Sequence, residues 1–98
     1  MIAKLHPKFT LLTDPSHAWV KVKKSYLVDL IGDDWRKYFT SFSYERKDFV
    51  YLEEQKDTVT FMKECRKKDI HPEFVCAEHK TDRPSKIRGY DPLAPMDL

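Results

Sequence analysis

Apolar and polar residues alternate along the first part of the chain, which is the pattern of half-buried β-strands. Two such runs occupy residues 8–13 (KFTLLT) and 18–22 (AWVKV), and Asp14-Pro15-Ser16-His17 separates them. The Asp side chain accepts hydrogen bonds from the backbone that follows it and Pro presets φ, so this tetrapeptide is typical of a turn. The pattern predicts an N-terminal hairpin with a loop of four or five residues.

A second hairpin is predicted over residues 39–54 (FTSFSYERKDFVYLEE), with its tip at 45–48. Its second strand, Phe49-Val50-Tyr51-Leu52, is apolar at every position. A strand with one face in water alternates instead, because successive side chains point to opposite faces. Both faces of the sheet around this strand therefore need a cover, and the hairpin organises the rest of the chain.

Helical periodicity appears in two segments. In residues 24–31, Leu27, Leu30 and Ile31 share one side, and Gly32 can close the helix. The stronger helix is predicted over residues 58–68, with Asp57 as its N-cap. Its inward stripe is formed by Val59, Phe61, Met62 and Cys65. Residues 33–38 favour another helical turn, and residues 73–79 (EFVCAEH) favour a last strand that begins after Pro72.

The element order ββαββαβ predicts a two-layer α+β domain over residues 1–79. We expect a mostly antiparallel five-stranded sheet with both helices on one face, and with strands 49–53 and 73–79 parallel. Residues 80–98 contain three prolines and read as an irregular tail that packs on the domain. Ile87, Tyr90 and Leu93 of this tail can cover the second face; otherwise a second copy could, through the sheet face or an exposed edge, as a homodimer.

The composition limits the classes to which the protein can belong, but it indicates no activity. The 98 residues are 41% hydrophobic and 13% aromatic, which suffices for one core. The net charge of +2 is too balanced to indicate nucleic acid or a membrane surface by itself. Residues 1–5 lack the apolar run of a signal peptide, and no stretch has the length of a membrane span. Two cysteines without a CxxC motif favour free thiols in a reducing cytosol.

The tail carries the densest cluster of cations, Lys80, Arg83, Lys86 and Arg88. An extended basic segment can follow phosphates, with Arg holding them through two bonds and Tyr90 stacking on a base. Acidic residues interleave with these cations, so the competing interpretation is a tail whose charges lie in water or pair with the sheet.

Other constellations predict less chemistry. His17 and His79 with Asp14 could form an acid/base set, but an Asp in a turn is more often structural. Cys65, His71, Cys76 and His79 lack the close ligand pairs of zinc sites. The adjacent Glu53 and Glu54 point to opposite faces of a strand. We therefore expect no catalytic residues, no metal and no cofactor.

Four motifs carry a resemblance to a family. They are TDPxHxW at 13–19, FSY at 42–44, VYLEE at 50–54 followed by Asp57, and HxTDRxSxIRxY at 79–90. In this order and spacing they resemble a family of small, uncharacterised bacteriophage-encoded proteins. The chain departs from the family pattern in a longer stretch at 32–38, in Lys47 where relatives often carry Gly, and in Gln55-Lys56 in place of a more acidic pair. A non-Gly residue at position 47 disfavours a simple left-handed bulge at the hairpin tip.

The resemblance implies a phage accessory protein that acts in the host cytoplasm. With no catalytic constellation, the leading hypothesis is a non-enzymatic binding module for a host macromolecule. A protein is preferred as this macromolecule, as in host take-over or counter-defence by an anti-CRISPR-type inhibitor. The alternatives are a nucleic-acid-binding protein that uses the tail and a small enzyme that uses His17 or His79. The candidate binding residues are His17, Trp19, His79, Lys80, Arg83, Lys86, Arg88 and Tyr90.

Overall fold

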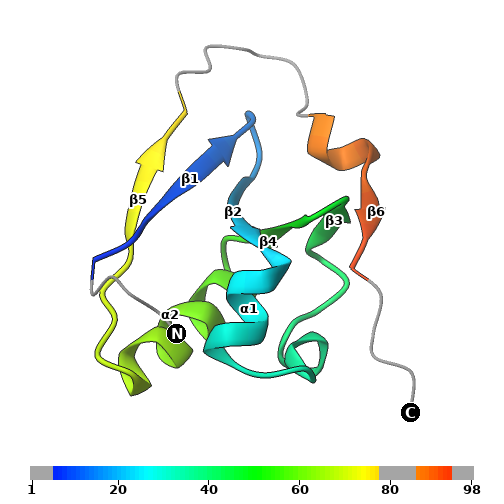
Figure 1. Cartoon of the computed structure of the whole chain (residues 1–98). Coiled ribbons are helices and arrows are strands. Elements are labelled where there is room, and N and C mark those ends of the chain that lie inside the picture. Colours follow the sequence, from blue (N-terminus) through cyan, green and yellow to red (C-terminus); the bar gives the residue numbers. More distant parts are fainter. Residues whose placement is uncertain (1–5, 78–85, 94–98) are drawn as a thin grey trace.

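The computed structural model describes residues 6–77 and 86–93, in which six strands form one mixed sheet (Figure 1). The strands are β1 (Lys8–Thr13), β2 (Ala18–Lys23), β3 (Tyr44–Arg46), β4 (Phe49–Glu53), β5 (Glu73–Cys76) and β6 (Asp91–Pro92). Their order across the sheet is β5-β1-β2-β4-β3-β6. The β1–β5 pair is parallel and the other four pairs are antiparallel.

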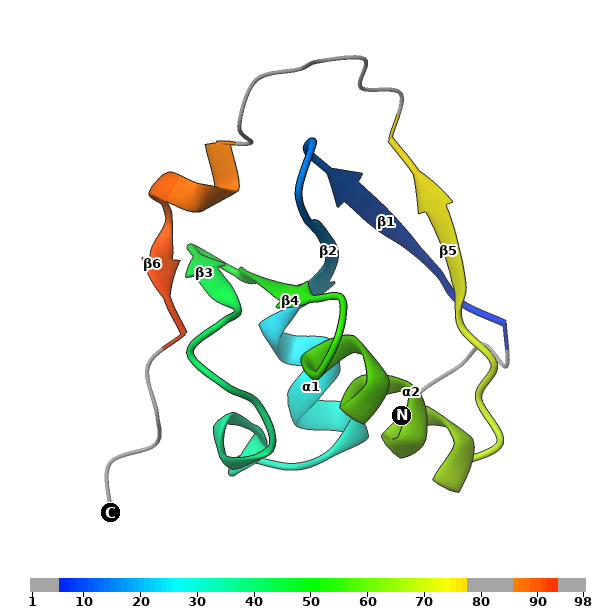
Figure 2. The same cartoon turned by 180° about the vertical axis from the view of Figure 1, so that it is seen from behind.

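The α+β class is confirmed, whereas the number of strands is corrected. The sixth strand, β6, pairs with β3 and lies in the segment that was expected to be irregular. The short 3₁₀ helix η2 (Lys86–Gly89) precedes it. Strands β4 and β5 run in the same direction, as expected, but β2 and β1 lie between them. Figure 2 shows β5 and β6 at opposite edges of the sheet.

Two helices, α1 (Lys24–Leu30) and α2 (Asp57–Lys67), lie on one side of the sheet (Figures 1 and 2), and the 3₁₀ helix η1 (Trp35–Tyr38) connects α1 to β3. Gly32 follows the C-cap of α1 with φ of +124°, a backbone conformation that favours glycine. In α2 the inward positions are Thr58, Phe61 and Cys65. Val59 is 43% exposed, so its assignment to the inward stripe was wrong.

Alternation along the strands divides the apolar residues between two cores. The main core lies under the helices and contains Val20, Val22, Val50 and Leu52 from the strands, with Leu27, Leu30, Trp35, Phe61, Cys65, Ile70 and Leu93. The second face carries a smaller cluster of Trp19, Tyr51 and Ile87. Ile87 is 3% exposed, so η2 covers part of the second face, while Leu93 joins the main core instead.

The central hairpin differs from expectation at both ends. Strand β3 begins at Tyr44, so residues 39–43 form a loop rather than a strand. The turn is only Lys47-Asp48, because Arg46 pairs with Phe49. Lys47 has φ of +53°, so this non-Gly residue does adopt the left-handed region, contrary to expectation.

Candidate functional site

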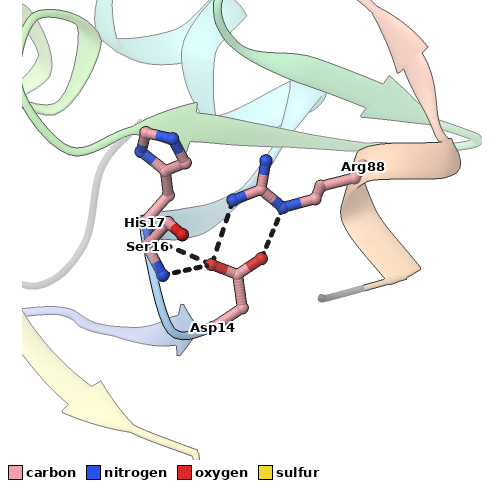
Figure 3. Close-up of polar contacts among 4 residues, drawn as sticks. All are labelled: Asp14, Ser16, His17 and Arg88. Atoms are coloured by element: carbon pink, nitrogen blue, oxygen red, sulfur yellow. Dashed lines mark hydrogen bonds and ion pairs between the residues drawn. The ribbon is translucent and has the colours of Figure 1, made fainter. Parts of the chain in front are cut away.

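The turn between β1 and β2 is joined to the C-terminal segment through Asp14. Its carboxylate accepts hydrogen bonds from the backbone N–H groups of Ser16 at 3.0 Å and His17 at 2.9 Å. Arg88 of η2 donates to the same carboxylate through Nε at 2.5 Å and a terminal nitrogen at 3.2 Å (Figure 3). The Asp14 side chain is completely buried, and this hydrogen bonding raises the pKa of Arg88 above its usual range. Asp14 therefore forms the expected turn and also anchors η2.

Aromatic rings and cations alternate around this anchor. The guanidinium of Arg88 lies 5.6 Å from the Trp19 ring, and that of Arg46 lies 4.9 Å from the Tyr90 ring. Tyr90 packs on Tyr51 with ring centroids 5.0 Å apart. Burial, and then the nearby Tyr90, raise the pKa of the Tyr51 hydroxyl. These contacts hold the tail residues against the second face of the sheet.

A hollow of about 320 Å³ opens beside the anchor, and we call it the His17 pocket. It is lined by His17, Trp19, Ser41, Phe42, Tyr44, Glu53, Gln55 and Arg88. Phe42 is 62% exposed at its rim, the largest exposure among the large apolar residues that the structure describes. The ammonium of Lys56 lies 5.8 Å from the Phe42 ring.

The loop that carries Phe42 is fixed by a buried carboxylate. Asp57, 1% exposed, accepts hydrogen bonds from the backbone N–H of Thr40 at 3.0 Å, from the Thr40 hydroxyl at 2.9 Å and from the Ser43 hydroxyl at 2.5 Å. The Ser43 hydroxyl in turn accepts from the backbone N–H of Glu53 at 2.9 Å. Asp57 is therefore the anchor of the loop and not the N-cap of α2. The Glu53 carboxylate takes the capping role, accepting from the backbone N–H groups of Lys56 and Asp57.

The structure brings together part of the expected site. His17, Trp19 and Arg88 share the His17 pocket, and Tyr90 lies next to it on Tyr51. Lys86 is exposed in η2. His79, Lys80 and Arg83 lie outside the described residues. The new members are Ser41, Phe42, Tyr44, Glu53 and Gln55; the FSY motif at 42–44 marked two of them, but its alternation indicated a strand.

The expected zinc set and the expected acid/base set share His79, which lies outside the described residues 6–77 and 86–93. In these segments no three His, Cys, Asp or Glu side chains lie together in a way that could hold a metal ion. Cys65 is buried in the main core, where burial raises the pKa of its thiol to about 11, and Cys76 is exposed on β5. His71 stacks on His6, with ring centroids 5.6 Å apart. His17 shares its pocket with one carboxylate, that of Glu53, which is engaged in capping α2.

The fold and this pocket define the class of the protein: a small α+β domain with a mixed six-stranded sheet and an aromatic hollow at the anchored C-terminal segment. Comparison of the chain with protein-family models, curated proteins and solved structures finds no match. None of the helices in the described part of the chain is long and apolar enough to cross a membrane.

Proposed function

We propose that the protein is a non-enzymatic binding module that engages another protein through Phe42 and the His17 pocket. The observation that carries this proposal is the exposed Phe42 ring on a loop fixed by Asp57. A ring carried on a loop that hydrogen bonds already fix requires little ordering of that loop on binding, which favours affinity.

The surroundings of Phe42 have the composition of a protein interface. Binding energy at such interfaces concentrates in Trp, Tyr and Arg side chains around central hollows. Trp19, Tyr44 and Arg88 line the hollow next to Phe42, and its volume of about 320 Å³ can receive one or two partner side chains. Phe42 would enter an apolar site on the partner while the pocket receives a partner side chain.

The family resemblance supplies the setting of this proposal. A phage accessory protein would act on a host protein in the host cytoplasm, as in host take-over or counter-defence. Binding of nucleic acid along the tail is the alternative. One of the cations that it would use, Arg88, already donates hydrogen bonds to Asp14.

The test is a pull-down from a lysate of the bacterial host with the immobilised protein, followed by calorimetry with the purified partner. We expect one stoichiometric partner, and Phe42→Ala should weaken its binding by about 10- to 100-fold, the range of a hot-spot residue. Val59→Ala is the matched control, because Val59 is an exposed apolar residue on α2 that does not line the His17 pocket. A Phe42→Ala variant that binds the partner as tightly as the unaltered protein would refute the proposal.

A further inference from the structure

A second hollow, of about 310 Å³, lies at the other end of the β1–β2 pair. It is lined by three lysines, Lys8, Lys21 and Lys23, and by Phe9, Thr10, Tyr26 and Phe49. We call these three residues the lysine cluster. We propose that the lysine cluster and the neighbouring rings of the second sheet face bind single-stranded nucleic acid. This site is distinct from Phe42 and does not depend on the protein partner proposed above.

Strand periodicity places the cluster on the face away from the helices. On β2, Lys21 and Lys23 alternate with Val20 and Val22, which are buried in the main core. On β1, Lys8 alternates with Phe9, which packs against the same core. Thr10 lies opposite Lys21 in the β1–β2 register, so cations from two adjacent strands face the same solvent.

The lysine cluster has no anionic partner in the described part of the chain. No carboxylate lines the hollow, and none of the three ammonium groups forms an ion pair with a described residue. The neighbouring Lys24 differs, because it pairs with Glu45 at 2.9 Å. Two exposed acids lie nearby, Glu73 beside Lys8 in the sheet register and Asp48 in the adjoining hollow with Lys23. Unpaired like charges on adjacent strands repel one another, and a bound anion removes that repulsion.

Aromatic rings interleave with the cations on this face. The Lys21 ammonium lies 4.1 Å from the centroid of the Phe49 ring, and the Arg46 guanidinium covers the ring of Tyr90 at 4.9 Å. Single-stranded nucleic acid offers the complementary sequence of groups, phosphates for the cations and flat bases for the rings. A base stacks on an aromatic ring more strongly than an exposed lysine does, so a base can displace Lys21 while its ammonium turns to a phosphate. A duplex keeps its bases inside the stack and cannot use these rings.

The test is fluorescence anisotropy with a labelled 15-nucleotide oligothymidine at several salt concentrations. We expect binding at low salt that weakens steeply as salt rises. In the variant Lys8→Gln/Lys21→Gln/Lys23→Gln the affinity should fall at least tenfold. The slope of log affinity against log salt should also decrease by about two units, because each phosphate contact on a single strand contributes roughly 0.7.

The matched control is Lys63→Gln/Arg66→Gln/Lys68→Gln, which removes the same charge from exposed positions on and just after α2, on the opposite side of the sheet. Circular dichroism checks that both variants fold. Phe49→Leu provides the stacking test, with affinity lowered several-fold and the salt slope unchanged.

Three results would overturn the proposal. The first is no binding of the oligonucleotide at low salt, and the second is an equal loss of affinity in the control variant. The third is displacement of the oligonucleotide by thymidine monophosphate at equal concentration, because it would mean that the cluster holds a single phosphate rather than a strand.

Discussion

The carboxylate of Asp57 is the most informative position for testing how the Phe42 loop is held. It accepts three hydrogen bonds from Thr40 and Ser43 while 1% exposed. A hydrogen bond to a charged group contributes about 1.5–3 kcal/mol to the stability of a protein. Leaving a buried donor without an acceptor lowers the stability by a comparable amount. The loop can partly rehydrate when the carboxylate is removed, so Asp57→Ala should lower the free energy of unfolding by about 3–5 kcal/mol. That is a large share of the roughly 5–15 kcal/mol typical of such a domain.

Urea unfolding followed by circular dichroism measures this loss, and the midpoint should fall while the slope with denaturant stays unchanged. Asp57→Asn keeps the shape and one acceptor oxygen, so its loss should be smaller, about 2 kcal/mol. Asp33→Ala removes an exposed carboxylate and should stay within about 0.5 kcal/mol of the unaltered protein. If Asp57→Ala were destabilised by less than about 1 kcal/mol, the carboxylate would not be the anchor of the loop.

Two further predictions concern backbone strain and pH. Lys47→Gly should raise the free energy of unfolding by about 0.5–1 kcal/mol, because φ of +53° at the first position of a two-residue hairpin turn favours glycine. Urea unfolding measures this change, and a lower free energy of unfolding in the variant would contradict the prediction. Burial raises the pKa of the Cys65 thiol from 9.0 to about 11, so the unfolded chain loses this proton first. The associated stability is fully present below pH 9 and should be lost as pH rises toward 11, by about 2–3 kcal/mol. Unfolding at pH 8 and pH 10.5 measures the loss, and a Cys65→Ala variant with an equally steep profile would contradict the assignment.

The elements with clear periodicity could be predicted from the sequence. Strands β1 and β2, helices α1 and α2 and the need for a cover over Tyr51 all follow from alternation or from helical spacing. Strand β6 could not be predicted, because two residues show no periodicity and one of them is Pro92. It forms because the edge of β3 accepts it, and that information lies in the tertiary structure.

The candidate site could be predicted only in part, for a related reason. The sequence motifs indicated His17, Trp19 and Arg88 as site residues. Their proximity depends on the hydrogen bond that Arg88 donates to Asp14, 74 positions earlier in the chain. Asp57 has the local signature of a helix cap, and the long-range bonds to Thr40 and Ser43 override it. By fixing this loop, Asp57 also leaves Phe42 exposed to solvent. Local alternation of residues had indicated a strand at this position instead.

The order of strands in the sheet has a consequence for how the chain folds. The first four strands and both helices precede β5 and β6 in sequence, yet β5 and β6 occupy the two outer positions. As the chain leaves the ribosome, β1 and β3 therefore emerge with their outer backbone groups unpaired, and such edges invite association between nascent chains. The two outer strands, β5 and β6, are therefore the last to pair with the sheet. Deletion of this C-terminal part of the chain would expose both edges and create a chain prone to aggregation rather than a smaller stable domain.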